Sequence, residues 1–453
     1  RLQLVEATGQ ATVLLPERSV PVAGPAGVAA TAGGRAVMVG NEPARGPGVY
    51  STDGTSQGTV RLCELDAGRS WSAASSAAGL AWFFSQSDGV IGSEIWRSDG
   101  TPAGTFAIGT IPAQWVSGFV ETAGGVLFGK HLYWTNGERG SLVHNGQADL
   151  PNFAASPDGK VYFFRRQRLY ELWVLDLGTG AAAPVPGVAQ VDGVSQFTMR
   201  FFGDRAFMLL NRSLWLLDRV NASARQLATN ATGLESAGGS GVVISYDPVM
   251  YRLSVALVDP QTGLMIDAGI FGSSAVMASR GDTAAIAINQ LGVLNLWTTD
   301  GTAEGTVRAV AAPGLQALGV GTMEFDGDEA ILRAYAGPAD PYAAWAVNLR
   351  GGTVHRVGRR GDAAERSPIL PIKITPVGGA ILSLQWTEAF DWQIYSVRRC
   401  AADFTADGFL DPFDWTAYVD SFEAGFPDAD FNGDGFVDFF DYDAFVGAFE
   451  AGC

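Results

Sequence analysis

The segment Trp96-Arg-Ser-Asp-Gly-Thr-Pro-Ala-Gly-Thr105 recurs twice in the chain, as Tyr50-Ser-Thr-Asp-Gly-Thr-Ser-Gln-Gly-Thr59 and as Trp297-Thr-Thr-Asp-Gly-Thr-Ala-Glu-Gly-Thr306. An Asp-Gly pair between two strand-like stretches is a strong hairpin signal. Glycine accepts a positive φ, and aspartate hydrogen-bonds its own backbone. Each copy therefore predicts an aromatic strand, a tight turn and a further strand.

Weaker copies continue the repeat over the first 399 residues. They share an apolar stretch, most often aromatic, and occur at Tyr133-Trp-Thr-Asn-Gly137, Trp173-Val-Leu-Asp176, Trp215-Leu-Leu-Asp218, Leu257-Val-Asp259, Trp345-Ala-Val-Asn348 and Ile394-Tyr-Ser396. Successive Asp or Asn positions lie 37 to 48 residues apart. A Gly-rich strand and an apolar strand, such as Leu80–Ser85, precede each aromatic strand. Four short strands at this period predict the blade of a β-propeller.

The sequence leaves the number of blades open between eight and nine. Nine copies can be counted, whereas propellers usually have four to eight blades. We expect a single large all-β propeller over residues 1–399, followed by a small α-helical module over residues 400–453. The stretch Leu2–Leu15 is expected to supply the missing fourth strand of the last blade, which would remove an exposed sheet edge.

The Trp-x-x-Asp-Gly-Thr-x-x-Gly-Thr pattern resembles the repeat of large, mostly uncharacterised propellers on secreted bacterial proteins. This resemblance implies an architecture and no particular activity.

The C-terminal module contains two twelve-residue acidic segments, Asp403–Asp414 and Asp430–Asp441, offset by 27 residues. Oxygen-bearing side chains fall at loop positions 1, 3, 5, 9 and 12, and Gly408 and Gly435 stand at position 6. This is the spacing of an EF-hand-like calcium loop. We expect two Ca²⁺ sites with side-chain ligands Asp403, Thr405, Asp407, Asp411 and Asp414 in the first loop and Asp430, Asn432, Asp434, Asp438 and Asp441 in the second, and with the backbone carbonyls of Phe409 and Phe436.

An amphipathic helix is predicted after each loop, over Phe413–Glu423 and Phe440–Glu450. The expected inward faces are Phe413, Ala417, Tyr418 and Phe422 on the first helix and Phe440, Ala444, Phe445 and Phe449 on the second. Phe439 is expected at the surface, as a contact for a protein partner or a second copy of the chain. The alternative is an acidic disordered tail, which two in-register copies make the weaker interpretation.

The ends of this module, Cys400-Ala-Ala-Asp-Phe404 and Gly452-Cys453, resemble those of dockerin-like modules on secreted bacterial proteins. In well-studied dockerins, loop positions 10 and 11 often carry small hydroxyl residues that meet a cohesin. Here they are Pro412-Phe413 and Phe439-Phe440, which argues against cohesin binding of that kind but not against calcium.

Cysteine and charge distribution favour an extracellular protein. Cys400 and Cys453 bracket the module, and a disulfide between them suits an oxidising compartment; alternatively, Cys453 is a covalent attachment point. Cys63 is expected to be a buried thiol. Of 47 acidic residues, 13 follow Cys400, which leaves 34 acids against 30 bases, a balance of −4, in the propeller. The chain has no basic patch for nucleic acid, no apolar run long enough to cross a bilayer and no signal-type segment at Arg1, so we expect the processed form of a secreted protein.

Catalytic motifs are absent from the sequence. The three histidines (His131, His144, His355) lack metal-ligand spacing, and no nucleophile elbow, phosphate loop or zinc-protease motif occurs. The primary expectation is therefore a non-catalytic propeller for scaffolding, self-assembly or adhesion. The alternative is a carbohydrate-active propeller (a lectin, glycosidase or lyase), for which converging carboxylates at the mouth of the ring would be the sign.

Overall fold

The structure of the chain is a computed structural model. It describes residues 2–5, 11–13, 28–30, 33–42, 45–53, 58–66, 69–86, 92–112, 119–122, 124–129, 132–144, 153–166, 168–221, 223–312, 319–326, 329–335, 343–349, 354–357, 373–377, 380–386, 392–398, 402, 404, 410, 412–426, 429–431 and 436–451.

The strands in these ranges form nine sheets, eight of four strands and one of five. The first four sheets comprise β3 (Val28–Ala30), β4 (Ala36–Glu42), β5 (Gly46–Thr52) and β6 (Val60–Glu64); β7 (Ser70–Ala77), β8 (Leu80–Gln86), β9 (Ser93–Ser98) and β10 (Phe106–Ile111); β11 (Phe119–Thr122), β12 (Gly125–Phe128), β13 (Tyr133–Thr135) and β14 (Val143–His144); and β15 (Phe153–Ala155), β16 (Lys160–Arg166), β17 (Tyr170–Asp176) and β18 (Ala182–Pro184).

The next four sheets comprise β19 (Phe197–Phe202), β20 (Arg205–Leu210), β21 (Ser213–Asp218) and β22 (Ser223–Thr229); β23 (Ala231–Ala237), β24 (Ser240–Asp247), β25 (Arg252–Val258) and β26 (Met265–Gly272); β27 (Ser274–Arg280), β28 (Thr283–Gln290), β29 (Val293–Thr299) and β30 (Val307–Ala312); and β31 (Gly319–Asp326), β32 (Glu329–Tyr335), β33 (Ala343–Asn348) and β34 (Val354–Val357). The last sheet has the order β2 (Ala11–Val13), β1 (Leu2–Val5), β37 (Trp392–Arg398), β36 (Ala380–Trp386), β35 (Lys373–Val377).

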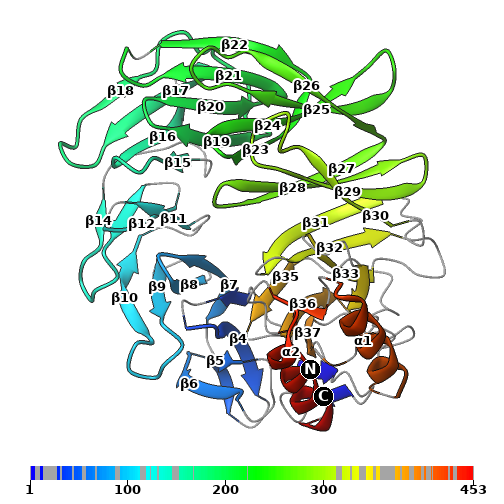
Figure 1. Cartoon of the computed structure of the whole chain (residues 1–453). Coiled ribbons are helices and arrows are strands. Elements are labelled where there is room, and N and C mark those ends of the chain that lie inside the picture. The colour runs from blue at the N-terminus through cyan, green and yellow to red at the C-terminus, as the bar shows by residue number, and fades with distance from the viewer. Residues whose placement is uncertain are drawn as a thin grey trace.

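The sheets surround a centre, as in a β-propeller. The first strand of each sheet contacts the first strand of the next, in the closed cycle β3, β7, β11, β15, β19, β23, β27, β31, β35 and back to β3. In Figure 1 the fourth strands, such as β22 and β26, lie on the outside. The fold is therefore β-propeller-like, as the repeat predicted.

The two ends of this ring meet in the five-stranded sheet. β1 pairs with β37 in parallel, Leu2 opposite Ile394, and β2 pairs antiparallel with β1. The N-terminal stretch therefore supplies the fourth strand of the last sheet, as expected, and a fifth strand in addition. This pairing covers an edge that β37 would otherwise expose.

Second strands with described side chains are largely buried, because neighbouring sheets cover both of their faces. All five residues from Ala284 to Ile288 on β28 are 0% exposed. Between the β3–β6 and β7–β10 sheets, Trp71, Phe83 and Trp96 pack with Val37 and Val49 in one cluster. The aromatic residue of the repeat thus fills space between sheets, while the Asp-Gly pair forms the turn after the third strand.

Two helices follow the sheets, α1 (Pro412–Ala424) and α2 (Phe439–Ala451). Both begin at loop position 10, so the predicted 27-residue offset is kept. Their shared core is centred on Tyr418 and Phe445, both 0% exposed, whose rings stack at 3.8 Å between centroids and 7° between planes. No helix in the described part of the chain has the length and hydropathy needed to cross a bilayer.

The predicted inward faces of these helices need correction at their first residues. Phe413 and Phe440 are 73% and 70% exposed. A helix turns by about 100° per residue, so Phe413 lies about 180° from Phe422, and Phe440 about 140° from Phe445. Asp441 and its counterpart Asp414 are buried at 0% exposure instead. Phe439 is exposed at 71%, as expected.

Candidate functional site

A cavity of about 460 Å³ lies against four strands, β19, β23, β27 and β31, each of which is the first strand of its sheet; the four sheets are consecutive in the ring. We call it the inner-strand cavity. Four of its nine described lining residues are charged. The lining consists of Arg200, Glu235, Met277, Ala278, Ser279, Arg280, Met323, Glu324 and Phe325.

The cavity lies toward one face of the ring. Arg200, Glu235 and Glu324 each stand two residues before the last paired residue of their strand, opposite Phe207, Val242 and Ile331 on the second strands. The first strands of successive sheets run in the same direction, so equivalent positions lie at the same depth. The cavity is therefore close to the turns that join first to second strands.

An ion pair fixes one wall of the cavity. The Arg200 guanidinium donates from Nε to Glu235 Oε2 at 3.1 Å and from Nη2 to Oε1 at 2.7 Å. Ser279 Oγ donates to the same Oε2 at 2.6 Å. Glu235 thereby connects β19, β23 and β27. Its side chain is only 17% exposed, so the carboxylate is held in one orientation.

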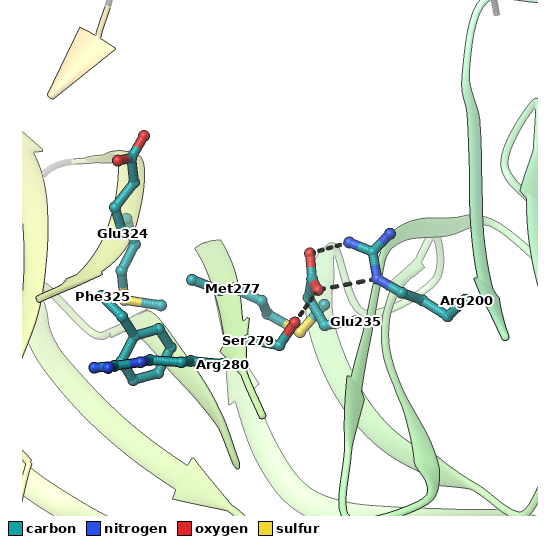
Figure 2. Close-up of a pocket in the computed structure, with 9 residues that line it drawn as sticks. Arg200, Glu235, Met277, Ser279, Arg280, Glu324 and Phe325 are labelled. Carbon is teal, nitrogen blue, oxygen red and sulfur yellow. Dashed lines mark hydrogen bonds and ion pairs between the residues drawn. The ribbon is translucent and has the colours of Figure 1, made fainter. Parts of the chain in front are cut away.

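The opposite wall carries Glu324, Arg280 and Phe325. Figure 2 shows Glu324 apart from the Arg200–Glu235 pair, with Met277 between them, and Arg280 beside Phe325. The cavity thus combines two carboxylates, two guanidiniums and one hydroxyl with the apolar surfaces of two methionines and a phenylalanine. Such a lining can hydrogen-bond a ligand with many hydroxyl groups and contact its apolar face.

None of these residues was among the predicted site residues. They come from strands spread over more than a hundred positions, and none stands in a recognisable motif. The available signal was weak: charged residues in first strands that are otherwise apolar or small, as in Phe197–Phe202 and Ala231–Ala237.

The predicted calcium ligands are described only in part. Asp403, Thr405, Asp407, Phe409, Asp411, Asn432 and Asp434 lie outside the described residues, as do Cys400 and Cys453. The described ligands are Asp414, Asp430, Phe436, Asp438 and Asp441. Within the described ranges, no three His, Cys, Asp or Glu side chains gather in a metal-binding arrangement. The predicted calcium sites and the disulfide therefore stay predictions.

The start of α2 shows how the second loop joins its helix. The backbone N–H of Phe440 donates to Asp438 Oδ1 at 2.8 Å, and the N–H of Asp438 donates to Asp441 Oδ2 at 2.8 Å. This reciprocal pair is a capping box with aspartate in the third helical position. It orients both carboxylates at the helix N-terminus, and such oxygens suit Ca²⁺.

Cys63 lies half-buried on β6 and is a free thiol. Burial raises the pKa of this thiol, with a smaller opposing hydrogen bond from the backbone of Val49. A thiol of raised pKa is a poor nucleophile. This agrees with a structural rather than a reactive cysteine.

No protein-family model matches the chain, and no curated protein matches it. Among solved structures, an oligogalacturonate lyase in complex with manganese is 14% identical, with a TM-score of 0.41 over 82% of this chain and 88% of that one. A puromycin hydrolase is 15% identical, with a TM-score of 0.41 over 84% of this chain. Oligopeptidase B from Trypanosoma brucei is 10% identical, with a TM-score of 0.42 over 73%. The chain spans 60% of the length of each of the last two.

These similar structures correct the primary functional expectation. They are of a lyase and of hydrolases, whereas the sequence was interpreted as a non-catalytic propeller for scaffolding, self-assembly or adhesion. That expectation is wrong. At such identities and TM-scores the likeness says nothing of this chain's own substrate.

Proposed function

We propose that the chain is a carbohydrate-active propeller protein and that the inner-strand cavity is its site. The observation that carries this proposal is that one cavity is lined by both Glu235 and Glu324, on facing walls formed by first strands of the ring. Its volume of about 460 Å³ is within the usual range for small-ligand sites. Carboxylates in a cavity of the ring distinguish a carbohydrate site from a flat apolar face for assembly.

The two carboxylates stand in different surroundings. Glu235 is held by Arg200 and Ser279, which suits a group that orients a sugar by accepting hydrogen bonds at a fixed place. Glu324 lies on the facing wall, and its carboxylate points away from Arg280, which lies beside Phe325. Acid–base cleavage of a glycan uses a pair of carboxyl groups flanking the bond. We assign Glu324 as the proton-transferring group and Glu235 as the fixed partner. None of the described residues that line the cavity is a tryptophan, so Phe325 and the two methionines would supply the apolar contact.

A panel of polysaccharides tests this proposal. The purified chain should bind or degrade at least one glycan, measured by calorimetry and by release of reducing ends or unsaturated products. Glu235→Gln should weaken binding. Glu304→Gln, on an exposed turn, is the matched control and should behave as wild type. The proposal fails if neither binding nor product appears with any glycan.

For the architecture we propose nine blades, one for each sheet. The closed cycle of nine first strands supports this number over eight. The sheet that contains β1 and β37 would then be the ninth blade, with its fifth strand β2 at the rim.

We also propose that residues 400–453 form a dockerin-like module with two Ca²⁺ ions. Support comes from the equivalent starts of α1 and α2 and from buried Asp414 and Asp441 at loop position 12 of each repeat. A divalent cation would neutralise carboxylates that burial otherwise disfavours. We retain secretion as part of this proposal, since a calcium-loaded module with flanking cysteines suits an extracellular setting.

A further inference from the structure

Four neighbouring hairpins carry an unusual combination of exposed residues. They join the second and third strands of the sheets β15–β18, β19–β22, β23–β26 and β27–β30, so their tips lie on the same face of the ring. Because each first strand runs from that face toward the inner-strand cavity, the tips lie on the face opposite the cavity.

The tips of the third and fourth hairpins are apolar. Val249, Met250 and Tyr251 are 80%, 60% and 79% exposed, and Leu291 is 103% exposed. Large apolar side chains at convex turn tips cannot be covered by their own sheets. We call the surface formed by the tips of the four hairpins the hairpin face. These four residues form its apolar half.

Leu291 occupies a position that disfavours leucine. Its φ is 55° and that of Gly292 is 86°, so the pair forms a two-residue turn in which both residues have positive φ. Asn, Asp or Gly is the usual first residue of such a turn, and a bulky side chain there is an outlier. Tyr251, at φ 52°, repeats the anomaly on the adjacent sheet. Because such residues lower the stability of the fold and expose apolar surface, they indicate a role in binding a partner and not in folding.

The tips of the first and second hairpins are basic. Arg166, Arg168 and Arg212 are exposed there. Arg252, at the foot of the third hairpin, stacks over Phe271 at 4.0 Å. The facing acids are few. Asp192 is exposed, Asp247 hydrogen-bonds the N–H groups of its own turn, and Glu171 lies opposite Arg165 on the paired strand. The balance is positive, in a chain whose overall charge is −17.

We propose that the hairpin face docks on an anionic lipid surface. Arginines attract acidic headgroups, and apolar tips with an aromatic residue enter the boundary between headgroups and acyl chains. The tips are protrusions rather than a groove, so they suit a deformable bilayer better than a shaped protein partner. In Figure 1 the helices α1 and α2 of the acidic C-terminal module are drawn over β36 and β37, on the side of the ring away from β16, β17, β20 and β21. Docking in this way leaves the cavity facing solvent.

Vesicle co-sedimentation tests the proposal, with vesicles of phosphatidylcholine alone and of equal parts phosphatidylcholine and phosphatidylglycerol. Wild type should bind the mixed vesicles and not the neutral ones. Arg166→Glu with Arg168→Glu should weaken binding more than tenfold, since each arginine near such a surface contributes about fivefold. Leu291→Asn should weaken binding and leave the thermal midpoint unchanged or raised, because asparagine tolerates the left-handed turn.

A matched control uses apolar residues on the opposite face. Val220 and Leu264 are 68% and 61% exposed in turns between third and fourth strands, so Val220→Ser with Leu264→Ser should bind vesicles as wild type does. The proposal is overturned if wild type does not bind the mixed vesicles, or if the control loses as much binding as Leu291→Asn. It is also overturned if the protein binds soluble polyglutamate, added as a competitor, as tightly as it binds the mixed vesicles. The last result would indicate an acidic polymer as the partner.

Discussion

Arg200 and Glu235, on the first strands of two adjacent sheets, are joined by two parallel N–H···O hydrogen bonds at 3.1 and 2.7 Å. The pair crosses from one sheet to the next at the wall of the inner-strand cavity. Its two side chains are 31% and 17% exposed. An ion pair with this geometry both holds a carboxylate in one orientation and connects neighbouring sheets.

The coupling between these two residues should be measurable. A double-mutant cycle with Arg200→Ala and Glu235→Ala should give about 1–2 kcal/mol in the free energy of unfolding, below the value for a fully buried charged pair because both groups are partly solvated. Arg212→Ala, at an exposed tip, should change stability by less than about 0.5 kcal/mol. A coupling indistinguishable from zero would show that the pair does not tie the sheets together.

Stability should fall in acid because the turn aspartates are held ionised. Hydrogen bonds from Asn221, first from its backbone N–H and then from its side chain, lower the pKa of Asp218 to about 2, with Arg205 contributing. The pKa values of Asp259 and Asp300 are lowered by hydrogen bonds from Thr262 and Thr302. The folded-state pKa lies below the unfolded value of about 3.9, so this stabilisation is complete above that pH and is lost as the pH falls toward about 2.

The test compares thermal midpoints at pH 5 and pH 3. Asp218→Asn should lose less on acidification than wild type, because its turn has no proton to take up. Asp282→Asn, on an exposed turn of another sheet, should follow wild type. Equal acid sensitivity in all three proteins would contradict a role for Asp218.

Most features of the ring that could be predicted from the sequence followed from its repeat. Aromatic strands, Asp-Gly turns and the closure by Leu2–Val5 depend on local chemistry and on a periodicity that the sequence carries. The cavity could not be found in the same way. Arg200, Glu235 and Glu324 come together only because the ring places the same depth of successive first strands side by side.

Helix orientation in the C-terminal module was predictable only in part. The 27-residue offset placed both helix starts to within one residue. The apolar pattern did not show that Phe413 and Phe440 face outward, because every turn of these helices contains an aromatic residue. In the structure Asp414 and Asp441 lie on the buried side of the helices. The sequence pattern identified both only as the last residues of the predicted calcium loops.

The Tyr418–Phe445 stack should control the stability of this module. Phe445→Ala removes a fully buried ring and should cost about 3–5 kcal/mol. Hydrogen exchange of the amides in α1 and α2, measured by mass spectrometry on the full chain, should accelerate accordingly. Phe439→Ala, at 71% exposure, is the control and should leave exchange unchanged. Equal protection in the two variants would place the core of the module elsewhere.

Calcium should bind at two sites and stabilise the module. Calorimetry on the full chain should give two sites in wild type and one in Asp441→Asn. Asparagine keeps an oxygen for the N–H of Asp438, so the cap survives while a charged ligand is lost. Asp443→Asn, exposed on the same helix, should retain both sites. Absence of calcium binding in wild type, or two unaltered sites in Asp441→Asn, would contradict the ligand assignment.

The role of the inner-strand cavity is tested most directly by the glycan turnover of Glu324→Gln compared with that of wild type, on whichever polysaccharide the wild-type chain degrades. Loss of a positioned proton-transfer group typically costs about a hundredfold or more in rate. We therefore predict at least that loss in kcat, with glycan affinity and thermal midpoint close to wild type. Unchanged turnover in Glu324→Gln, with Glu304→Gln as the reference, would contradict the assignment of the inner-strand cavity as the site.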